Sequence, residues 1–112
     1  MALSFKRRYI NLIVLGEKTA TRRMKRPWLR EGGLYPIRVG FHNLGEYIRV
    51  KKIYRQRLGE LTEEDLAKEG MNSLEEFKEE WRRIYGFWDD GFTAWVIEFE
   101  YVGRAPEEDR KI

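Results

Sequence analysis

The segment GEKTATRR, residues 16–23, lies between an amphipathic first segment and a strongly basic one, and the chain is organised around it. Gly16 follows an apolar run where a helix should end, because glycine adopts the left-handed conformation without steric cost. An extended chain after this turn places Thr21 and Arg23 on the same face. With Lys18 at the turn, this short segment offers an ammonium, a hydroxyl and a guanidinium to a single ligand.

A helix is predicted before this segment, ending at about Leu15. Its apolar positions follow helical spacing from Phe5 through Tyr9 to Ile13, and Ser4 is a suitable N-cap. The expected order is therefore a capped amphipathic helix, a glycine turn and a short strand.

A basic segment follows, in which Pro27 and paired glycines exclude regular structure. It carries Lys25 and Arg26 beside Trp28. An aromatic ring among cations is typical of proteins that hold single-stranded nucleic acid by base stacking and backbone attraction. The alternative is that Trp28 closes one end of a barrel, and this structural interpretation is the preferred one.

The rest of the chain predicts strands at about 34–40, 47–57 and 92–102, with a turn at 41–45. Pro36 favours an edge position for the first of these strands, and the break at Lys51-Lys52 indicates a bulge in the second. Capping residues Thr62 and Ser73 open two helices, the second with an apolar stripe. We therefore expect an α+β domain, a small curled sheet with helices covering its openings.

The composition indicates a single domain of 112 residues, which we place at 1–102 with a flexible tail at 103–112. The chain has no cysteine and its longest apolar run has four residues, so we expect a cytoplasmic protein without a membrane segment. His42 is the only histidine, and we expect neither a metal site nor a cofactor. The abundance of Glu, Lys and Arg over Asn and Gln fits a thermophilic source.

The charge is strongly partitioned along the chain. Residues 1–30 carry nine Lys or Arg against one acid, whereas residues 60–80 carry nine acids against two lysines. Because basic fields attract phosphate groups, one end of the molecule favours a phosphate-bearing partner. The acidic run reads mostly as a solvated helix face, except for Glu69, which lies at the end of a short helix.

Two segments resemble the ASCH domain family, small β-barrels related to PUA RNA-binding domains. The first is the Gly-x-Lys-x-x-Thr-x-Arg pattern that begins at Gly16, and the second runs from 61 to 86 through Lys68-Glu69-Gly70-Met71. The resemblance covers about residues 3–102. It implies a PUA-like curled barrel for the fold.

A branch of ASCH proteins that this chain resembles hydrolyses N(4)-acetylcytidine to cytidine and acetate. Matched to its motif, the catalytic residues would be Lys18, Thr21 and Glu69. The chemistry is consistent with amide hydrolysis, since a threonine hydroxyl needs a base, and an amine acts as one only when its pKa falls toward neutrality. Desolvation and nearby cations such as Arg22 or Arg23 would lower it, while Glu69 would oppose them.

The competing interpretation is an RNA-contacting edge without turnover, in which Arg22 and Arg23 hold phosphates and aromatic rings stack on bases. A third is purely structural, with Lys18 and Glu69 as an ion pair. Two departures from the family pattern bear on the substrate: Arg22 stands where an apolar residue is common, and Gly70 where a polar one is. The predicted partner is thus RNA or a cytidine-type nucleoside, and the oligomeric state stays open.

Overall fold

The computed structural model describes residues 2–104 and contains a five-stranded sheet with helices. The elements in chain order are β1 (Leu3–Ser4), α1 (Arg7–Val14), β2 (Ala20–Arg23), β3 (Leu34–Val39), β4 (His42–Arg57), a 3-10 turn (Leu58–Glu60), α2 (Glu63–Lys68), α3 (Leu74–Tyr85) and β5 (Thr93–Gly103). The predicted α+β class is confirmed, and so is the curled sheet.

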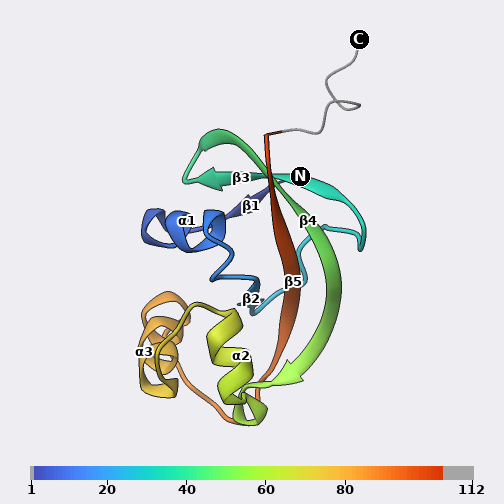
Figure 1. Ribbon diagram of the computed structural model, residues 1–112. Helices are drawn as coiled ribbons and strands as arrows, with labels where there is room; N and C mark the ends of the chain where they lie inside the picture. The colour runs from blue at the N-terminus through green and yellow to red at the C-terminus, as the bar shows by residue number, and fades with distance from the viewer. Residues whose placement is uncertain (1, 105–112) are drawn as a thin grey trace.

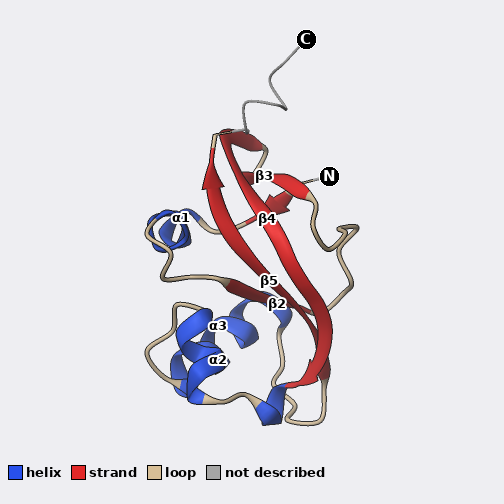
Figure 2. Ribbon diagram, turned by 45° about the vertical axis from the view of Figure 1, so that its right-hand side comes forward, coloured by secondary structure: helices blue, strands red, loops and turns tan. Residues whose placement is uncertain are grey.

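The strand order is β1-β3-β4-β5-β2, with β1 parallel to β3 and every other pair antiparallel. The long β4 and β5 form the curved spine of the molecule, and the three α-helices lie on the same side of it (Figure 1). A register shift between Val50 and Lys52 breaks the β4–β5 ladder, which confirms the bulge predicted there. This bend curls the sheet around the helices (Figure 2).

Three local predictions near the sheet edge were wrong. Ser4 does not cap α1 but pairs with Arg38 in β1, and the helix begins two residues later than expected, at Arg7. β4 begins at His42, inside the expected turn. Pro36 lies in an inner strand, since β3 is flanked by β1 and β4, and it is accommodated where the β3–β4 register shifts.

Two apolar clusters fill the space between helices and sheet. The first joins α1 and β1 to β3, β4 and β5, and the second packs α2 and α3 against the other end of the long strands. The predicted stripe of α3 is buried at Phe77 and Trp81, whereas Ile84 is 51% exposed. The helices therefore meet the sheet at two separate places, one on either side of β2 (Figure 1).

The chain ends bear on two further predictions. β5 runs to Gly103, one residue beyond the expected domain limit. The flexible tail was predicted for residues 103–112, and its part from residue 105 onward lies outside the described residues. No helix in residues 2–104 is long and apolar enough to cross a membrane.

Candidate functional site

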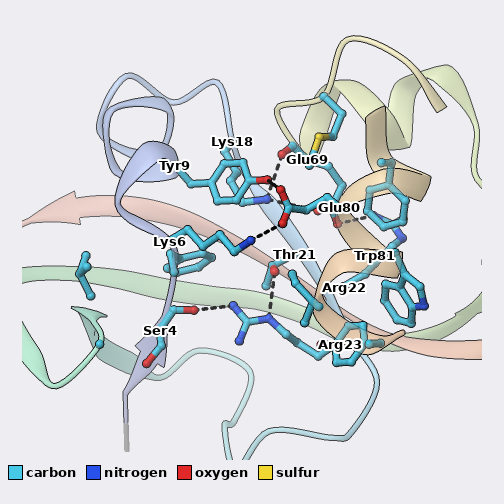
Figure 3. Close-up of a pocket in the computed structure, with 17 residues that line it drawn as sticks. Ser4, Lys6, Tyr9, Lys18, Thr21, Arg22, Arg23, Glu69, Glu80 and Trp81 are labelled. Carbon is cyan, nitrogen blue, oxygen red and sulfur yellow. Dashed lines mark hydrogen bonds and ion pairs between the residues drawn. The ribbon is translucent and has the colours of Figure 1, made fainter. Parts of the chain in front are cut away.

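A cavity of about 410 Å³ lies where β2 passes between the two helical clusters. Its wall takes residues from the β1–α1 segment, β2, the β3–β4 turn, the end of α2 and α3, and we call it the main cavity. Small-molecule pockets commonly have about 300–1,000 Å³, so this one is large enough for a single nucleoside-sized ligand. Figure 3 shows the side chains that converge on it.

Lys18 and Glu69 meet inside the protein although they are 51 positions apart. The Lys18 ammonium donates to the Glu69 backbone oxygen at 2.9 Å and to its Oε1 at 3.2 Å, and both side chains are 3% exposed. Two backbone turns create this contact. Gly16 has φ +76° after α1, as predicted. Gly70 has φ +77° after α2, and Glu69, just before it, is the C-cap residue of that helix.

Arg22 completes a buried ion cluster with Glu69. Its Nη1 donates to Glu69 Oε2 at 2.8 Å, its Nε and Nη2 donate to Gln56, and its Nη2 lies 3.4 Å from Asp65. All three guanidinium nitrogens therefore have acceptors within the protein, and the side chain is 1% exposed. Arg22 thus holds Glu69 and does not present its fork to a phosphate.

Thr21 and Arg23 lie on the same side of β2, as the strand periodicity predicts. Arg23 Nε donates to Thr21 Oγ1 at 3.1 Å, and Arg23 Nη2 donates to the Ser4 backbone oxygen at 2.7 Å. Thr21 is buried, and both side chains line the main cavity. Within the described part of the chain, Arg23 forms no ion pair with a carboxylate, so its charge is available to the cavity.

Burial lowers the pKa of the Lys18 ammonium, because desolvation penalises its charged form. Glu69 opposes this effect through its charge and its hydrogen bond, whereas Arg23 and Arg22 add to the lowering. The Tyr9 ring also lies 4.9 Å from Lys18 Nζ. The environment therefore shifts the pKa of Lys18 downward, which is the direction that a general base requires.

A second carboxylate in the cavity was missed by the sequence reasoning. Glu80 is 5% exposed on α3, accepts a hydrogen bond from Tyr9 Oη at 3.0 Å and pairs with Lys6. The signal was present: Glu80 falls on the buried stripe of α3 between Phe77 and Trp81, where an acid is rare. In the sequence, Glu80 belongs to the acidic run that reads as a solvated helix face.

The remaining predicted binding residues lie apart from this site. Arg26 and Trp28 line a second hollow, on the basic loop, and Lys25 is exposed nearby in the sequence. The Arg26 guanidinium carbon lies over the Trp95 ring, 4.9 Å from the ring centroid. Trp28 is 82% exposed, so the prediction that it closes a barrel end was wrong. The eight predicted residues thus divide between the main cavity and a separate surface.

In residues 2–104, no group of three or more His, Cys, Asp or Glu side chains is placed to hold a metal ion. The cavity wall carries a buried amine, a hydroxyl beside a guanidinium, and two buried carboxylates. The fold and cavity thus define an α+β domain with a small-molecule-sized pocket built from acid, base and hydroxyl groups.

The sequence matches no family model and no curated protein. Solved structures do resemble it. The ASCH domain of Lactobacillus crispatus JV V101 has a TM-score of 0.63 at 15% identity, over 84% of this chain and 70% of that one. The Y47F mutant of the ZmASCH protein of Zymomonas mobilis has a TM-score of 0.64 at 16% identity, over 88% of this chain and 67% of that one.

A protein of Enterococcus faecalis V583 assigned to the family DUF984 has a TM-score of 0.65 at 22% identity, over 93% of this chain and 72% of that one. These likenesses concern the fold, because all the identities are low. The chain has the fold of ASCH domains, which confirms the predicted resemblance at the level of structure.

Proposed function

We propose that this chain binds a cytidine-type nucleoside in the main cavity and hydrolyses an N4-acyl amide, with N(4)-acetylcytidine as the expected substrate. The observation that carries the proposal is the meeting of Lys18, Thr21 and Glu69, from three separate segments, at one nucleoside-sized cavity. A structural ion pair alone would not need the cavity or the hydroxyl beside it.

Hydrogen bonds orient Lys18 for the role of a base. A neutral amine has two N–H groups and one lone pair, and the two Glu69 oxygens accept both N–H groups. The lone pair is then left for a third partner. Because burial lowers the pKa of Lys18, a neutral fraction becomes accessible nearer to working pH than it is for an exposed lysine.

Thr21 is the proposed nucleophile, and Arg23 prepares it. Arg23 Nε donates to Thr21 Oγ1, so the hydroxyl oxygen already accepts one bond and its own proton is free to leave toward a base. A cation at this distance also stabilises developing negative charge on the oxygen. The same guanidinium has no carboxylate partner among the described residues and can face the carbonyl oxygen of the substrate.

The reaction then balances without a cofactor. Lys18 takes the Thr21 hydroxyl proton as Oγ1 bonds to the carbonyl carbon of the acetyl group. The bond between that carbon and N4 then breaks as Lys18 gives the proton to N4. Cytidine leaves, and water, deprotonated by Lys18, attacks the acetyl ester of Thr21. The ester bond breaks as Lys18 returns this proton to Thr21 Oγ1, and the acetic acid that is released loses its remaining proton to solvent to give acetate.

Glu69 acts in this scheme as a positioning residue. Each of its carboxylate oxygens receives a cationic donor, Lys18 on Oε1 and Arg22 on Oε2. Because both carboxylate oxygens are already held by these donors, the geometry supports a fixed positioning role for Glu69. Arg22 correspondingly anchors Glu69 and does not contact the ligand.

Acetate release from N(4)-acetylcytidine tests the proposal. Lys18→Met and Thr21→Val are expected to lower kcat/KM by about 10²–10⁴-fold, the usual contribution of a general base. Lys52→Met, which removes an exposed lysine of β4, is the matched control and should retain activity. Absence of acetate with the wild-type protein, or equal activity in Lys18→Met, would rule the hydrolase out.

A second candidate function, RNA binding at the basic loop, is favoured by the exposure of Trp28. Stacking of one base on an aromatic ring contributes about 1–3 kcal/mol, so Trp28→Ala should weaken binding of a short single-stranded RNA at least fivefold. Phe41→Ala is the control, because Phe41 is a 95% exposed aromatic at a different turn. Affinity that is insensitive to salt, or equal losses in both variants, would contradict this function.

A further inference from the structure

Three cations gather at the mouth of the main cavity. The exposed lining residues mark where the cavity opens, and they are Ser4, Lys6, Gly40 and Ile84. Arg8 and Arg83 do not line the cavity themselves, but they pair with Glu80, which does. The side chains of Lys6, Arg8 and Arg83 are 43%, 54% and 60% exposed, so they remain accessible to a ligand from solvent.

All three cations converge on one carboxylate, that of Glu80. Oε1 pairs with Lys6, while Oε2 pairs with Arg8, accepts from Tyr9 Oη at 3.0 Å and lies 3.8 Å from Arg83. Figure 3 shows the Lys6 side chain reaching Glu80 inside the cavity. The carboxylate supplies only one negative charge to these three cations.

The ion pairs around Glu80 leave an excess of two positive charges among these four residues. Three cations share a single carboxylate, and in the described part of the chain no other acid forms an ion pair with any of them. Like-charge repulsion is evident at Lys6: desolvation lowers the pKa of its ammonium first, and Arg8 and Arg83 lower it further. An incoming anion would relieve this repulsion.

We infer that the mouth of the main cavity is a phosphate subsite and that the ligand is a pyrimidine mononucleotide with a terminal phosphate. A phosphate monoester carries close to two negative charges at neutral pH, which matches the excess. The inference rests on the proposed function for the base end of the pocket. Glu80 serves as the anchor that holds Lys6, Arg8 and Arg83 together in the absence of ligand.

Calorimetric titration of the full chain with cytidine and with cytidine 5′-monophosphate tests the subsite. An exposed ion pair contributes up to about fivefold in affinity, so two uncompensated charges predict a preference for the monophosphate of up to about twenty-fivefold at low salt. The preference should shrink as salt is raised. Added inorganic phosphate should weaken the binding of cytidine 5′-monophosphate and leave the affinity for cytidine unchanged.

The double variant Arg8→Gln/Arg83→Gln should reduce the preference to less than about twofold. Arg7→Gln is the matched control, because Arg7 is an exposed neighbour on α1 that forms no ion pair within the described residues. A wild-type preference below twofold would overturn the subsite. So would an equal loss in Arg7→Gln, which would reveal a general effect of net charge.

A cytidine-containing dinucleotide separates a terminal phosphate from the backbone of a polymer. Equal affinity for the dinucleotide and the monophosphate would overturn the mononucleotide assignment. Acetate release from N(4)-acetylcytidine by the same wild-type sample tests the proposed function separately. Release without a preference for the monophosphate removes only the subsite, whereas preference without release removes only the hydrolase.

Discussion

Glu69→Gln should destabilise the protein far more than its modest change in shape suggests. The carboxylate is 3% exposed and bridges two cations whose side chains are 3% and 1% exposed, those of Lys18 and Arg22. Removing one partner of a buried ion pair costs about 3–5 kcal/mol, because the other charge is left without compensation. Arg22 keeps Gln56 and Asp65, so we expect the lower end, about 3 kcal/mol.

The opposite substitution, Lys18→Met, should cost much less. It removes a cation whose pKa burial already lowers, fills a similar volume with an apolar chain and leaves Glu69 paired with Arg22. We expect about 1 kcal/mol. The asymmetry between the two variants is therefore the signature of a carboxylate that holds two cations at once.

Urea denaturation at pH 7 measures both free energies of unfolding. For a domain of this size, 3 kcal/mol corresponds to a fall in Tm of roughly 12 °C. Glu64→Gln is the control, since that 80% exposed carboxylate pairs with Lys68 at 3.7 Å and should contribute less than about 0.5 kcal/mol. Similar losses in Glu69→Gln and Glu64→Gln, or a larger loss in Lys18→Met, would refute the buried cluster.

Further predictions concern pH and backbone strain. Folding lowers the pKa of Lys18 from its ordinary value near 10.5, so the unfolded chain binds more protons at pH values between the folded-state pKa and 10.5. The free energy of unfolding of wild type relative to Lys18→Met should therefore rise as the pH increases toward 10.5, by at most about 1.4 kcal/mol per pH unit, and a flat difference contradicts the shift. Gly70→Ala should lower the free energy of unfolding in urea more than Gly45→Ala does. Both glycines have positive φ, but of the two only Gly70 would place a Cβ 3.1 Å from a side chain, that of Leu12. Equal losses in the two variants would exclude this contact as a cause. Burial and the hydrogen bond to Glu98 raise the pKa of Tyr54 to about 12, so this phenol should ionise at a higher pH than an ordinary tyrosine. Tyr54→Phe should remove this late step from a pH titration followed by absorbance at 295 nm.

The fold was largely predictable because its signals are local. The glycine turn after α1, the Thr62 cap of α2 and the apolar run of β5 each follow from a few adjacent residues. The errors at Ser4 and His42 have a common cause. A two-residue strand and the first residues of a long one are stabilised by pairing with β3, and that pairing leaves no trace in local composition.

The candidate site was predictable only in part. The spacing in β2 placed Thr21 and Arg23 together, and the resemblance added Glu69, but nothing in the sequence showed that Arg22 would be enclosed by Glu69, Gln56 and Asp65. A guanidinium on a strand looks the same in sequence whether it faces solvent or a buried acid. Its burial follows from where α2 is packed, which is a long-range property.

The buried charges themselves argue for function. A buried ion cluster is commonly no more stable than well-packed apolar residues of similar volume, so stability alone gives no reason to place Lys18, Arg22 and Glu69 in the interior. Their burial does have a chemical consequence, because it shifts the Lys18 pKa and fixes the direction of its hydrogen bonds. Charge placed where it costs stability, at the wall of a cavity, is what preorganised catalysis requires.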